Sequence, residues 1–415
     1  MRILHTADWH LGKSLEGRSR LEEQRRFLSD FVRIVKNENA DLVLIAGDIY
    51  DSPNPPAEAE KMFYRTLKQI TEEGKRLVLV IAGNHDSPER LVAAGPLAME
   101  HGILMAGLPG SVIPVGAYGC HQVLDSGEGY VELEINGEKA VILLLPYPSE
   151  KRLNEVIYQE LDSEEKKAAS YGERIGRFFA LLEEKYREDT INLAVAHLFA
   201  MDASAGGSER GMMLGGSYLV DGDCLPKKAQ YIALGHVHKP QAVPHTQGRA
   251  FYSGAPMPYH RNEAGARRQC SLIELHPGTP FVKKDILLPS YKPIEIWHAE
   301  SMEQAYSMCE AHREEDSWVY LEIRTERGYI REDEIRKMKN WKKDILEIRP
   351  IVSGTGQMES MGKPLEEKSL KQLFTEYYCQ ENGGVVPDEE LISLLLELAG
   401  ELGEEERDEA IKTDD

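Results

Sequence analysis

The chain has 415 residues, of which 70 are acidic and 49 basic, so its formal net charge is −21. That charge argues against a protein that holds nucleic acid by bulk positive charge. The length suggests two or three domains, since one domain usually takes roughly 100–200 residues. A hydrophobic fraction of 41% with 29% charged residues is ordinary for a globular protein and argues against wholesale disorder.

Targeting and membrane signals are not expected from this sequence. The longest apolar runs, such as residues 141–145, are far shorter than the about 20 residues of a membrane-spanning helix. Asp8 interrupts the N-terminal stretch before a signal-peptide core could form, which predicts a cytoplasmic protein. The five cysteines form no Cys-x-x-Cys pair and are expected to be free thiols.

Residues 1–289 alternate short apolar runs with segments of helical spacing. The runs cover residues 2–5, 42–46, 77–82, 140–145, 191–196, 231–234, 250–252 and 271–275. Continuous runs of this length fit strands buried on both faces, as in a sheet covered by helices. Apolar residues recur at helical spacing over residues 21–35 and 175–186. The pattern predicts a layered α/β domain.

Residues 290–353 follow a different pattern, which predicts a small α+β domain. We expect strands at 293–298, 318–325 and 346–352, with helices after Ser301 and over residues 332–343. Ser301 with Gln304 three residues later is a capping box that opens the first helix. Val319, Leu321 and Ile323 alternate with polar residues, which indicates a half-buried strand.

After a linker at residues 353–356, residues 365–403 predict two amphipathic helices, followed by an acidic tail at 404–415. Two short helices cannot bury their apolar stripes alone, so they either fold back or dock on a partner. The stripe residues proposed to bind a partner are Leu370, Leu373, Phe374, Tyr377, Leu391, Leu394, Leu395 and Leu398.

Five polar motifs each follow a predicted strand in the first domain. They are Asp8-Trp9-His10, Gly47-Asp48, Gly83-Asn84-His85-Asp86, Ala196-His197 and Gly235-His236-Val237-His238. Because ligand sites of open α/β sheets form at the carboxyl ends of the strands, these motifs are expected to converge on one pocket. A side chain at Gly47, Gly83 or Gly235 would crowd a backbone that turns sharply there.

The residue types indicate a metal centre. Seven oxygen and nitrogen ligands without a thiolate suit two five- or six-coordinate ions of the manganese or iron kind, with one carboxylate shared. His236 and His238 either chelate one ion together or are splayed to two ions by the turn after Gly235. Two adjacent ions can activate a water and neutralise phosphoryl oxygens, which favours a phosphoester hydrolase. The seven predicted ligands are Asp8, His10, Asp48, Asn84, His197, His236 and His238.

These motifs, in this order, resemble the calcineurin-like metallophosphoesterase superfamily. More narrowly, residues 1–13, 47–51, 235–241 and 252–256 resemble the SbcD family of DNA exonuclease subunits. The resemblance implies a layered β-sandwich metallophosphoesterase core flanked by helices, a small α+β capping domain that binds DNA, and C-terminal helices that bind a partner.

The resemblance also implies residue roles. Asp8, His10 and His238 would hold one Mn²⁺, and Asn84, His197 and His236 the other, with Asp48 bridging. His85 would contact the scissile phosphate or assist the leaving oxygen, with Asp86 orienting its ring. Some relatives carry a histidine where this chain has Asp51. Basic residues near the motifs are candidate DNA contacts: Lys13, Arg18, Arg20, Arg90, Lys239, Arg261, Arg267 and Arg268.

The function implied is that of a catalytic subunit of an SbcCD-like complex, which hydrolyses DNA at double-strand ends and hairpins in repair, recombination and replication. The partner would be the SMC-like ATPase SbcC, with a homodimer of this chain inside a heterotetramer, associated with the nucleoid. The sequence holds no phosphate loop of its own. Two alternatives remain open: a phosphodiesterase acting on a small nucleotide, and a non-catalytic scaffold of the same fold.

Overall fold

The computed structural model describes residues 1–149, 152–153, 171–200, 219–325, 328–352, 370–381, 387–388 and 391–395. The chain divides into two compact units, Met1–Pro293 and Ile294–Asp415. The sequence predicts this boundary after residue 289. Each unit is described separately below.

The first unit is built on two large sheets. The six-stranded sheet has the order β18-β17-β1-β4-β5-β6, and β1, β4, β5 and β6 are parallel. The eight-stranded sheet has the order β15-β16-β14-β11-β10-β9-β8-β7, and β10, β11, β14 and β16 are parallel. The strands of the first sheet are β1 Arg2–Thr6, β4 Leu42–Ala46, β5 Leu77–Ile81, β6 Ile103–Ala106, β17 Gln269–Glu274 and β18 Val282–Leu287. Those of the second are β7 Gly116–Tyr118, β8 His121–Gly127, β9 Tyr130–Ile135, β10 Glu138–Leu145, β11 Ile191–His197, β14 Tyr231–Gly235, β15 Gln241–Ala242 and β16 Ala250–Tyr252. Short pairs are β2 Ser14–Leu15 with β3 Arg18–Ser19, and β12 Phe199–Ala200 with β13 Leu219–Val220.

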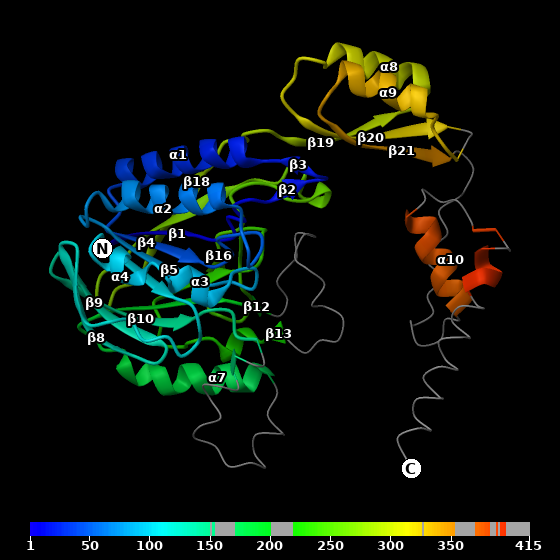
Figure 1. Cartoon of the computed structure of the whole chain (residues 1–415). Helices are drawn as coiled ribbons and strands as arrows, with labels where there is room; N and C mark the ends of the chain where they lie inside the picture. Colours follow the sequence, from blue (N-terminus) through cyan, green and yellow to red (C-terminus); the bar gives the residue numbers. More distant parts are fainter. Residues whose placement is uncertain are drawn as a thin grey trace, which may run out of the picture. The chain divides into compact units, whose positions relative to one another are not determined.

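The two sheets pack face to face between outer helices, which confirms the predicted layered fold. An apolar core between the sheets includes Leu44, Leu79, Ile142 and Leu193. Helices α1 (Leu21–Asn37) and α2 (Ala57–Thr71) cover the first sheet, and α7 (Tyr171–Leu182) covers the second (Figure 1). Short helices α3 (Pro88–Val92) and α4 (Gly95–Met99) precede β6. The central strands β4, β5 and β14 are buried along their whole length, which explains why their sequences are continuous apolar runs.

All eight predicted strands of this unit are present, but the sequence analysis did not identify β6, β7, β8, β9 or β18. Strand β9 alternates buried Val131, Leu133 and Ile135 with glutamates, so it has no apolar run. Strand β18 is an edge strand and is largely exposed. Edge and half-buried strands tolerate polar residues, so a search for apolar runs passes over them.

The second unit contains the predicted strand–helix–strand–helix–strand domain. Its parallel sheet has the order β19-β20-β21, and helices α8 and α9 share a core with it. Ser301 Oγ accepts from the Gln304 N–H at 3.2 Å and caps α8, as predicted. Tyr320, which stands between the apolar positions Val319 and Leu321 in the predicted alternation, is buried as well. The elements are β19 Ile294–Ala299, α8 Met302–Ala311, β20 Trp318–Thr325, α9 Glu332–Trp341 and β21 Ile345–Val352.

The C-terminal stripes are described in part. Helix α10 spans Leu370–Glu381, and residues 391–395 are helical after Asp388, whose Oδ1 accepts from the Leu391 N–H at 2.8 Å. Tyr377 and Leu394 are exposed. Leu398 and the acidic tail lie outside the described residues. Within the part of the chain that the structure describes, no helix has the length and apolar character needed to cross a bilayer.

Candidate metal centre

The five polar motifs meet where the parallel strands of both sheets end. Asp8 follows β1, Asp48 follows β4, Asn84 follows β5, His197 ends β11, and His236 follows β14. The first two loops run side by side, since the Asp8 N–H donates to Gly47 O and the His10 N–H donates to Asp48 O, both at 3.0 Å. The His236 N–H donates to Asp8 Oδ1 at 2.9 Å and joins the second sheet to the first.

The backbone is bent into the left-handed region at four of these residues. Asp8, His10, Asp48 and His236 have φ values of 56°, 43°, 50° and 98°. Such conformations are costly for residues other than glycine and concentrate at functional sites, where the surrounding structure enforces them. The bends turn side chains from separate strands toward a common centre.

Glycines allow the two sheets to approach at this centre. A Cβ on Gly235 would lie 1.8 Å from Ala46 O, and one on Gly83 would lie 2.1 Å from Asp48 Oδ1. A Cβ on Gly47 would lie 2.3 Å from His197 Nδ1. The predicted need for glycine at these three positions is therefore confirmed.

One group of ligand atoms comprises Asp8, His10 and His238, whose donor atoms lie within 4.8 Å of one another. His10 Nε2 and His238 Nε2 are 3.1 Å apart. A second group comprises Asp48, His197 and His236. His236 and His238 therefore face different groups, which decides between the two arrangements that the sequence left open.

Asn84 completes the second group, and Asp48 lies between the two. Asn84 Oδ1 is 3.0 Å from His197 Nε2 and 2.9 Å from His236 Nδ1. Asp48 Oδ2 is 3.6 Å from His10 Nε2 and 3.4 Å from His197 Nε2. The structure thus brings all seven predicted ligands together, with one carboxylate oxygen between the two groups.

The residues present fit divalent cations. Asp8 Oδ2 is buried without a hydrogen-bond partner, although a buried carboxylate oxygen normally has one. The facing Nε2 atoms of His10 and His238 would repel each other as two lone pairs, and a cation between them removes that repulsion. The donors are oxygen and nitrogen atoms only, as suits borderline and hard divalent ions.

The protonation states of the ligands depend strongly on their burial and on one another. Burial raises the pKa of Asp8 to about 7 and lowers the pKa of His236 to about 3. Burial acts to lower the pKa of His197 as well, but the carboxylate of Asp48 outweighs it and raises that pKa to about 9. Conversely, burial disfavours the charge of Asp48, yet the imidazoles of His197 and His10 hold its pKa well below the usual range.

Comparison with known proteins follows the same division of the chain. Residues 1–240 match the calcineurin-like phosphoesterase family, and residues 290–382 match the type 5 capsule protein repressor C-terminal domain. The SbcD subunit of the SbcCD nuclease of Bacillus subtilis is 38% identical over 412 residues, which cover 98% of this chain and 100% of that protein. This chain belongs to the SbcD family of calcineurin-like phosphoesterases.

Two further relatives are more distant. The SbcD subunit of the SbcCD nuclease of Rhodobacter capsulatus is 31% identical over 351 residues, 79% of this chain and 81% of that protein. A solved structure of a dimetal phosphatase from Danio rerio is 13% identical, covers 68% of this chain and 98% of that one, and has a TM-score of 0.34. The resemblance inferred from the motifs is confirmed at the level of the SbcD family.

In this SbcD-family chain His85 is oriented by Asp51 rather than by Asp86. His85 Nδ1 donates to the backbone carbonyl of Asp51 at 2.8 Å. Asp86 instead accepts from the backbone N–H groups of Gly83, Tyr50 and Ile49, at 2.8, 3.0 and 3.2 Å. The expected role of Asp86 in orienting the ring is wrong, because its carboxylate is fully engaged in tying two strand-end loops together.

The SbcD-family site also includes residues that the motifs did not reveal. Glu263 Oε1 accepts from His238 Nδ1 at 3.0 Å, and Glu263 Oε2 accepts from Arg268 at 2.7 Å. Glu263 belongs to none of the five strand-end motifs and lies in no apolar or helical repeat of the sequence. The sequence analysis therefore had no signal that pointed to it. Arg20 and Arg268 are buried beside Glu23 and Glu263. Neither arginine is therefore placed to contact DNA.

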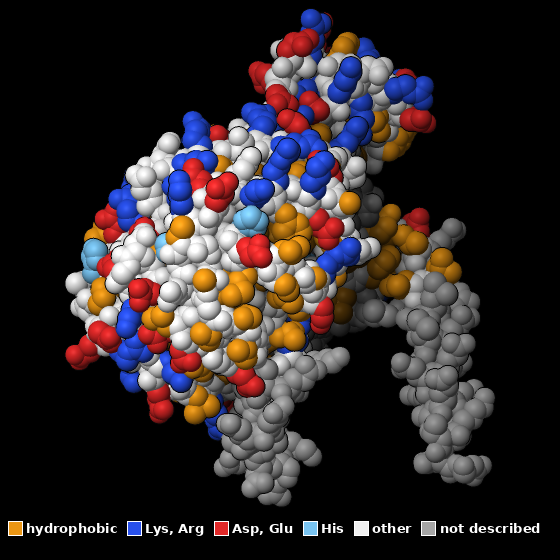
Figure 2. All heavy atoms as spheres, turned by 60° about the vertical axis from the view of Figure 1, so that its left-hand side comes forward, with side chains coloured by type: hydrophobic (Ala, Val, Ile, Leu, Met, Phe, Trp, Pro, Cys, Tyr) orange, Lys and Arg blue, Asp and Glu red, His pale blue; other side chains and the backbone are white. Residues whose placement is uncertain are grey.

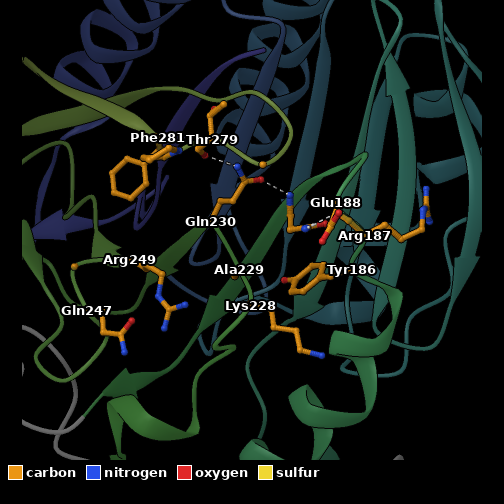
Figure 3. A pocket seen from close by; sticks show the side chains of 14 residues that line it. Tyr186, Arg187, Glu188, Lys228, Ala229, Gln230, Gln247, Arg249, Thr279 and Phe281 are labelled. Atoms are coloured by element: carbon orange, nitrogen blue, oxygen red, sulfur yellow. Dashed lines mark hydrogen bonds between the residues drawn. The ribbon is translucent and has the colours of Figure 1, made fainter.

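A separate pocket of about 630 Å³ lies at the opposite, amino ends of β11, β14 and β16 (Figure 3). Its wall is held by Gln230, whose Nε2 donates to Thr279 O at 2.6 Å. Lys228, Arg249 and Phe281 also line it. None of the predicted site residues of this SbcD-family chain lies there.

Proposed function

We propose that this chain is the catalytic subunit of an SbcCD-like complex and hydrolyses DNA phosphodiesters at double-strand ends and hairpins. The observation that carries the proposal is the position of Asp48 Oδ2 between His10 Nε2 and His197 Nε2, with the other ligands around it. The relatives named as SbcD subunits of the SbcCD nuclease support it. Such a subunit would work in the cytoplasm at the nucleoid, in DNA repair, recombination and replication.

Asp8, His10 and His238 would hold one ion and Asn84, His197 and His236 the other, with Asp48 shared. The donors are nitrogen and oxygen atoms with no thiolate, a set that suits a hard or borderline divalent ion, and we assign Mn²⁺.

When bound, the two ions would activate a water and neutralise charge on the phosphoryl oxygens. His85 supplies the proton chemistry. Because the Asp51 carbonyl can only accept, His85 carries a proton on Nδ1 and keeps Nε2 for exchange with substrate. His85 lies against His10, with ring centroids 4.7 Å apart. In its doubly protonated form the ring would donate the Nε2 proton to the leaving oxygen beside the ions and return to the neutral form that keeps only the Nδ1 proton.

The partner would be the SMC-like ATPase SbcC, bound by the C-terminal stripes, in a heterotetramer that contains two copies of this chain. Tyr377 is 62% exposed and Leu394 is 52% exposed, so both side chains are accessible to a partner. The match of residues 290–382 to a family domain supports a dedicated role for the second unit, and we assign it DNA binding.

The proposal is tested in three incubations of the full chain with Mn²⁺. The first contains a DNA hairpin, the second a cyclic nucleotide, and the third the hairpin together with the ATPase partner. We expect hairpin cleavage that falls at least about 100-fold in His85→Gln. His101→Gln is the matched control, since His101 is a partly exposed histidine outside the site, and it should cleave normally.

The other outcomes identify the alternatives. Hydrolysis of the cyclic nucleotide alone would indicate a small-nucleotide phosphodiesterase. If the complex cleaves the hairpin equally well with His85→Gln or Asp48→Ala, this chain is a scaffold and not the catalyst.

A further inference from the structure

One histidine of the metal centre is backed by a carboxylate through a hydrogen bond, since His238 Nδ1 lies 3.0 Å from Glu263 Oε1. Because an ionised carboxylate only accepts, His238 directs its Nδ1 proton to Glu263 and its Nε2 lone pair to the ion. His10 Nε2 faces His238 Nε2 at 3.1 Å. Asp51 Oδ1 lies 3.5 Å from His10 Nδ1 without a hydrogen bond and adds negative charge near the same ion site.

Glu263 is held rigidly in this position. It is 3% exposed, and its Oε2 accepts from Arg268 Nη2 at 2.7 Å and from the Tyr259 N–H at 3.0 Å. Arg268 Nη1 also donates to His238 O at 3.0 Å. The arginine compensates the buried charge of Glu263 and also bonds the backbone of His238, so both residues are held by the same side chain.

The histidines of the other ion site are supported differently. His197 Nδ1 donates to the neutral carbonyl of Ala46 at 2.8 Å. His236 turns its Nδ1 toward Asn84 Oδ1 and stacks on Tyr147, with ring centroids 6.2 Å apart. Within the described residues, the carboxylate that forms an ion pair with His197 is the shared ligand Asp48. No ion pair between described residues involves His236.

The direct ligands of the two sites also differ in negative charge. The site of His10 and His238 includes Asp8 and the shared Asp48, which are two carboxylates. The site of His197 and His236 includes Asn84 and the shared Asp48, which is one carboxylate and a neutral amide. Attraction of a dication grows with the negative charge around it, most strongly in a buried, low-dielectric site.

We propose that the two ions are held unequally, and that Glu263 positions His238 so that the site of Asp8, His10 and His238 is the tighter one. This inference rests on the proposed function, because it uses the same seven ligands. A carboxylate behind a metal-bound imidazole fixes the ring and increases its basicity. At limiting metal the tighter site fills first, and hydrolysis follows the filling of the weaker site.

The test is a titration of the metal-free full chain with Mn²⁺, with free Mn²⁺ followed by its electron paramagnetic resonance signal. We expect two classes of one ion each. Glu263→Gln should weaken the tight class by about 10- to 100-fold and leave the weak class unchanged. Asn84→Ala should abolish the weak class and keep the tight one, which assigns each class to its site.

Glu23→Gln is the matched control, because Glu23 is likewise buried and paired with an arginine, Arg20. It should lower the melting temperature while both Mn²⁺ classes stay unchanged. If Glu263→Gln does not fold, Asp51→Asn acts on His10 of the same site from a 30% exposed position and should weaken the tight class by a smaller factor.

Equal affinity of the two classes in the wild-type chain would overturn the inference. The inference would also be overturned if Glu263→Gln or Asp51→Asn weakened both Mn²⁺ classes equally. It would be overturned as well if neither variant weakened either class. The readout does not depend on cleavage of DNA. A chain that binds two ions unequally but cleaves no DNA would overturn the proposed function and leave this inference standing.

Discussion

At the scale of single residues, the metal centre depends on a backbone that only some residues can adopt. Asp8, His10, Asp48 and His236 all have positive φ, and each such conformation costs on the order of 1–3 kcal/mol. Close packing of the sheets at Gly235 holds the bent loops in place. Residues that never touch a ligand are therefore needed for its geometry.

Replacing Gly235 by alanine should disrupt the centre. The new Cβ would lie 1.8 Å from the carbonyl oxygen of Ala46, so the backbone must shift, at a cost of about 1–3 kcal/mol. We expect a lower melting temperature and weaker Mn²⁺ binding. Gly95→Ala is the control, because a Cβ there meets nothing within 4 Å; equal behaviour of the two variants would contradict the prediction.

Binding of the ions should release protons. The carboxylate of Asp48 raises the pKa of His197 to about 9, so at pH 7 the metal-free imidazole is protonated and must lose its proton to bind an ion. Below pH 9 the apparent affinity should therefore fall as the pH falls, about tenfold per pH unit for this proton. Burial raises the pKa of Asp8 to about 7, which adds a second proton below pH 7.

Calorimetric Mn²⁺ titrations at pH 7 in two buffers of different ionisation enthalpy measure this release directly. The heats should differ in proportion to the protons released. Heats that do not depend on the buffer would show that the ligands are already deprotonated.

At the scale of elements, the loop after β1 is anchored through Trp9, which lies between two ligands. Trp9 is fully buried, and its ring meets Phe27, Phe31 and Phe63 edge-on, at centroid distances of 5.6, 5.5 and 6.2 Å. Its Nε1 donates to Thr6 Oγ1 at 2.9 Å. The aromatic side chain thus holds the loop against α1 and α2 while its neighbours carry the ligands.

Trp9→Ala should cost about 3–5 kcal/mol of stability and weaken Mn²⁺ binding, because the loop that carries Asp8 and His10 loses its anchor. The free energy of unfolding in urea and a Mn²⁺ titration of the folded fraction measure the two effects. Val35→Ala, a buried change in the same core, should lower stability without changing Mn²⁺ affinity. Unchanged affinity in Trp9→Ala would rule out the anchoring role.

At the scale of the whole molecule, the acidic charge is unevenly distributed along the chain. Residues 359–415 hold 17 acidic and five basic side chains, a net charge of −12 out of −21. On the face of the first unit in Figure 2, basic side chains are interspersed with acidic ones rather than gathered in one patch. We therefore expect the isolated chain to bind DNA weakly and to depend on its ions and its partner.

Docking of the partner is tested on the exposed stripe residues. Tyr377→Asp and Leu394→Asp should each lower the affinity for the ATPase partner at least about tenfold, since buried interface anchors often contribute 2 kcal/mol or more. Metal-dependent hydrolysis of a model phosphodiester by the chain alone should not change. Lys371→Ala on the same helix is the control. Undiminished co-purification of both aspartate variants with the ATPase would reject the docking role.

The sequence by itself indicated the eight buried strands, helices α1 and α7, the second unit and the seven candidate ligands that the structure brings together. It did not indicate α2, which also covers the first sheet. These features are local or are carried by the order of motifs, because a strand buried on both faces is apolar along its length and the candidate ligands stand in short motifs directly after such strands. The half-buried strands such as β9 lacked such a signal, since only alternate residues face the core.

The residue pattern left open whether His236 and His238 belong to one group or to two. The tertiary structure separates them, as the family resemblance implied, and it alone shows what supports them. The turn at His236 sends its ring to Asn84, while His238 faces His10 and is backed by Glu263. Asp86 ties loops together and leaves His85 to the carbonyl of Asp51. Such contacts join residues far apart in the chain through specific backbone dihedrals, and neither composition nor periodicity encodes them.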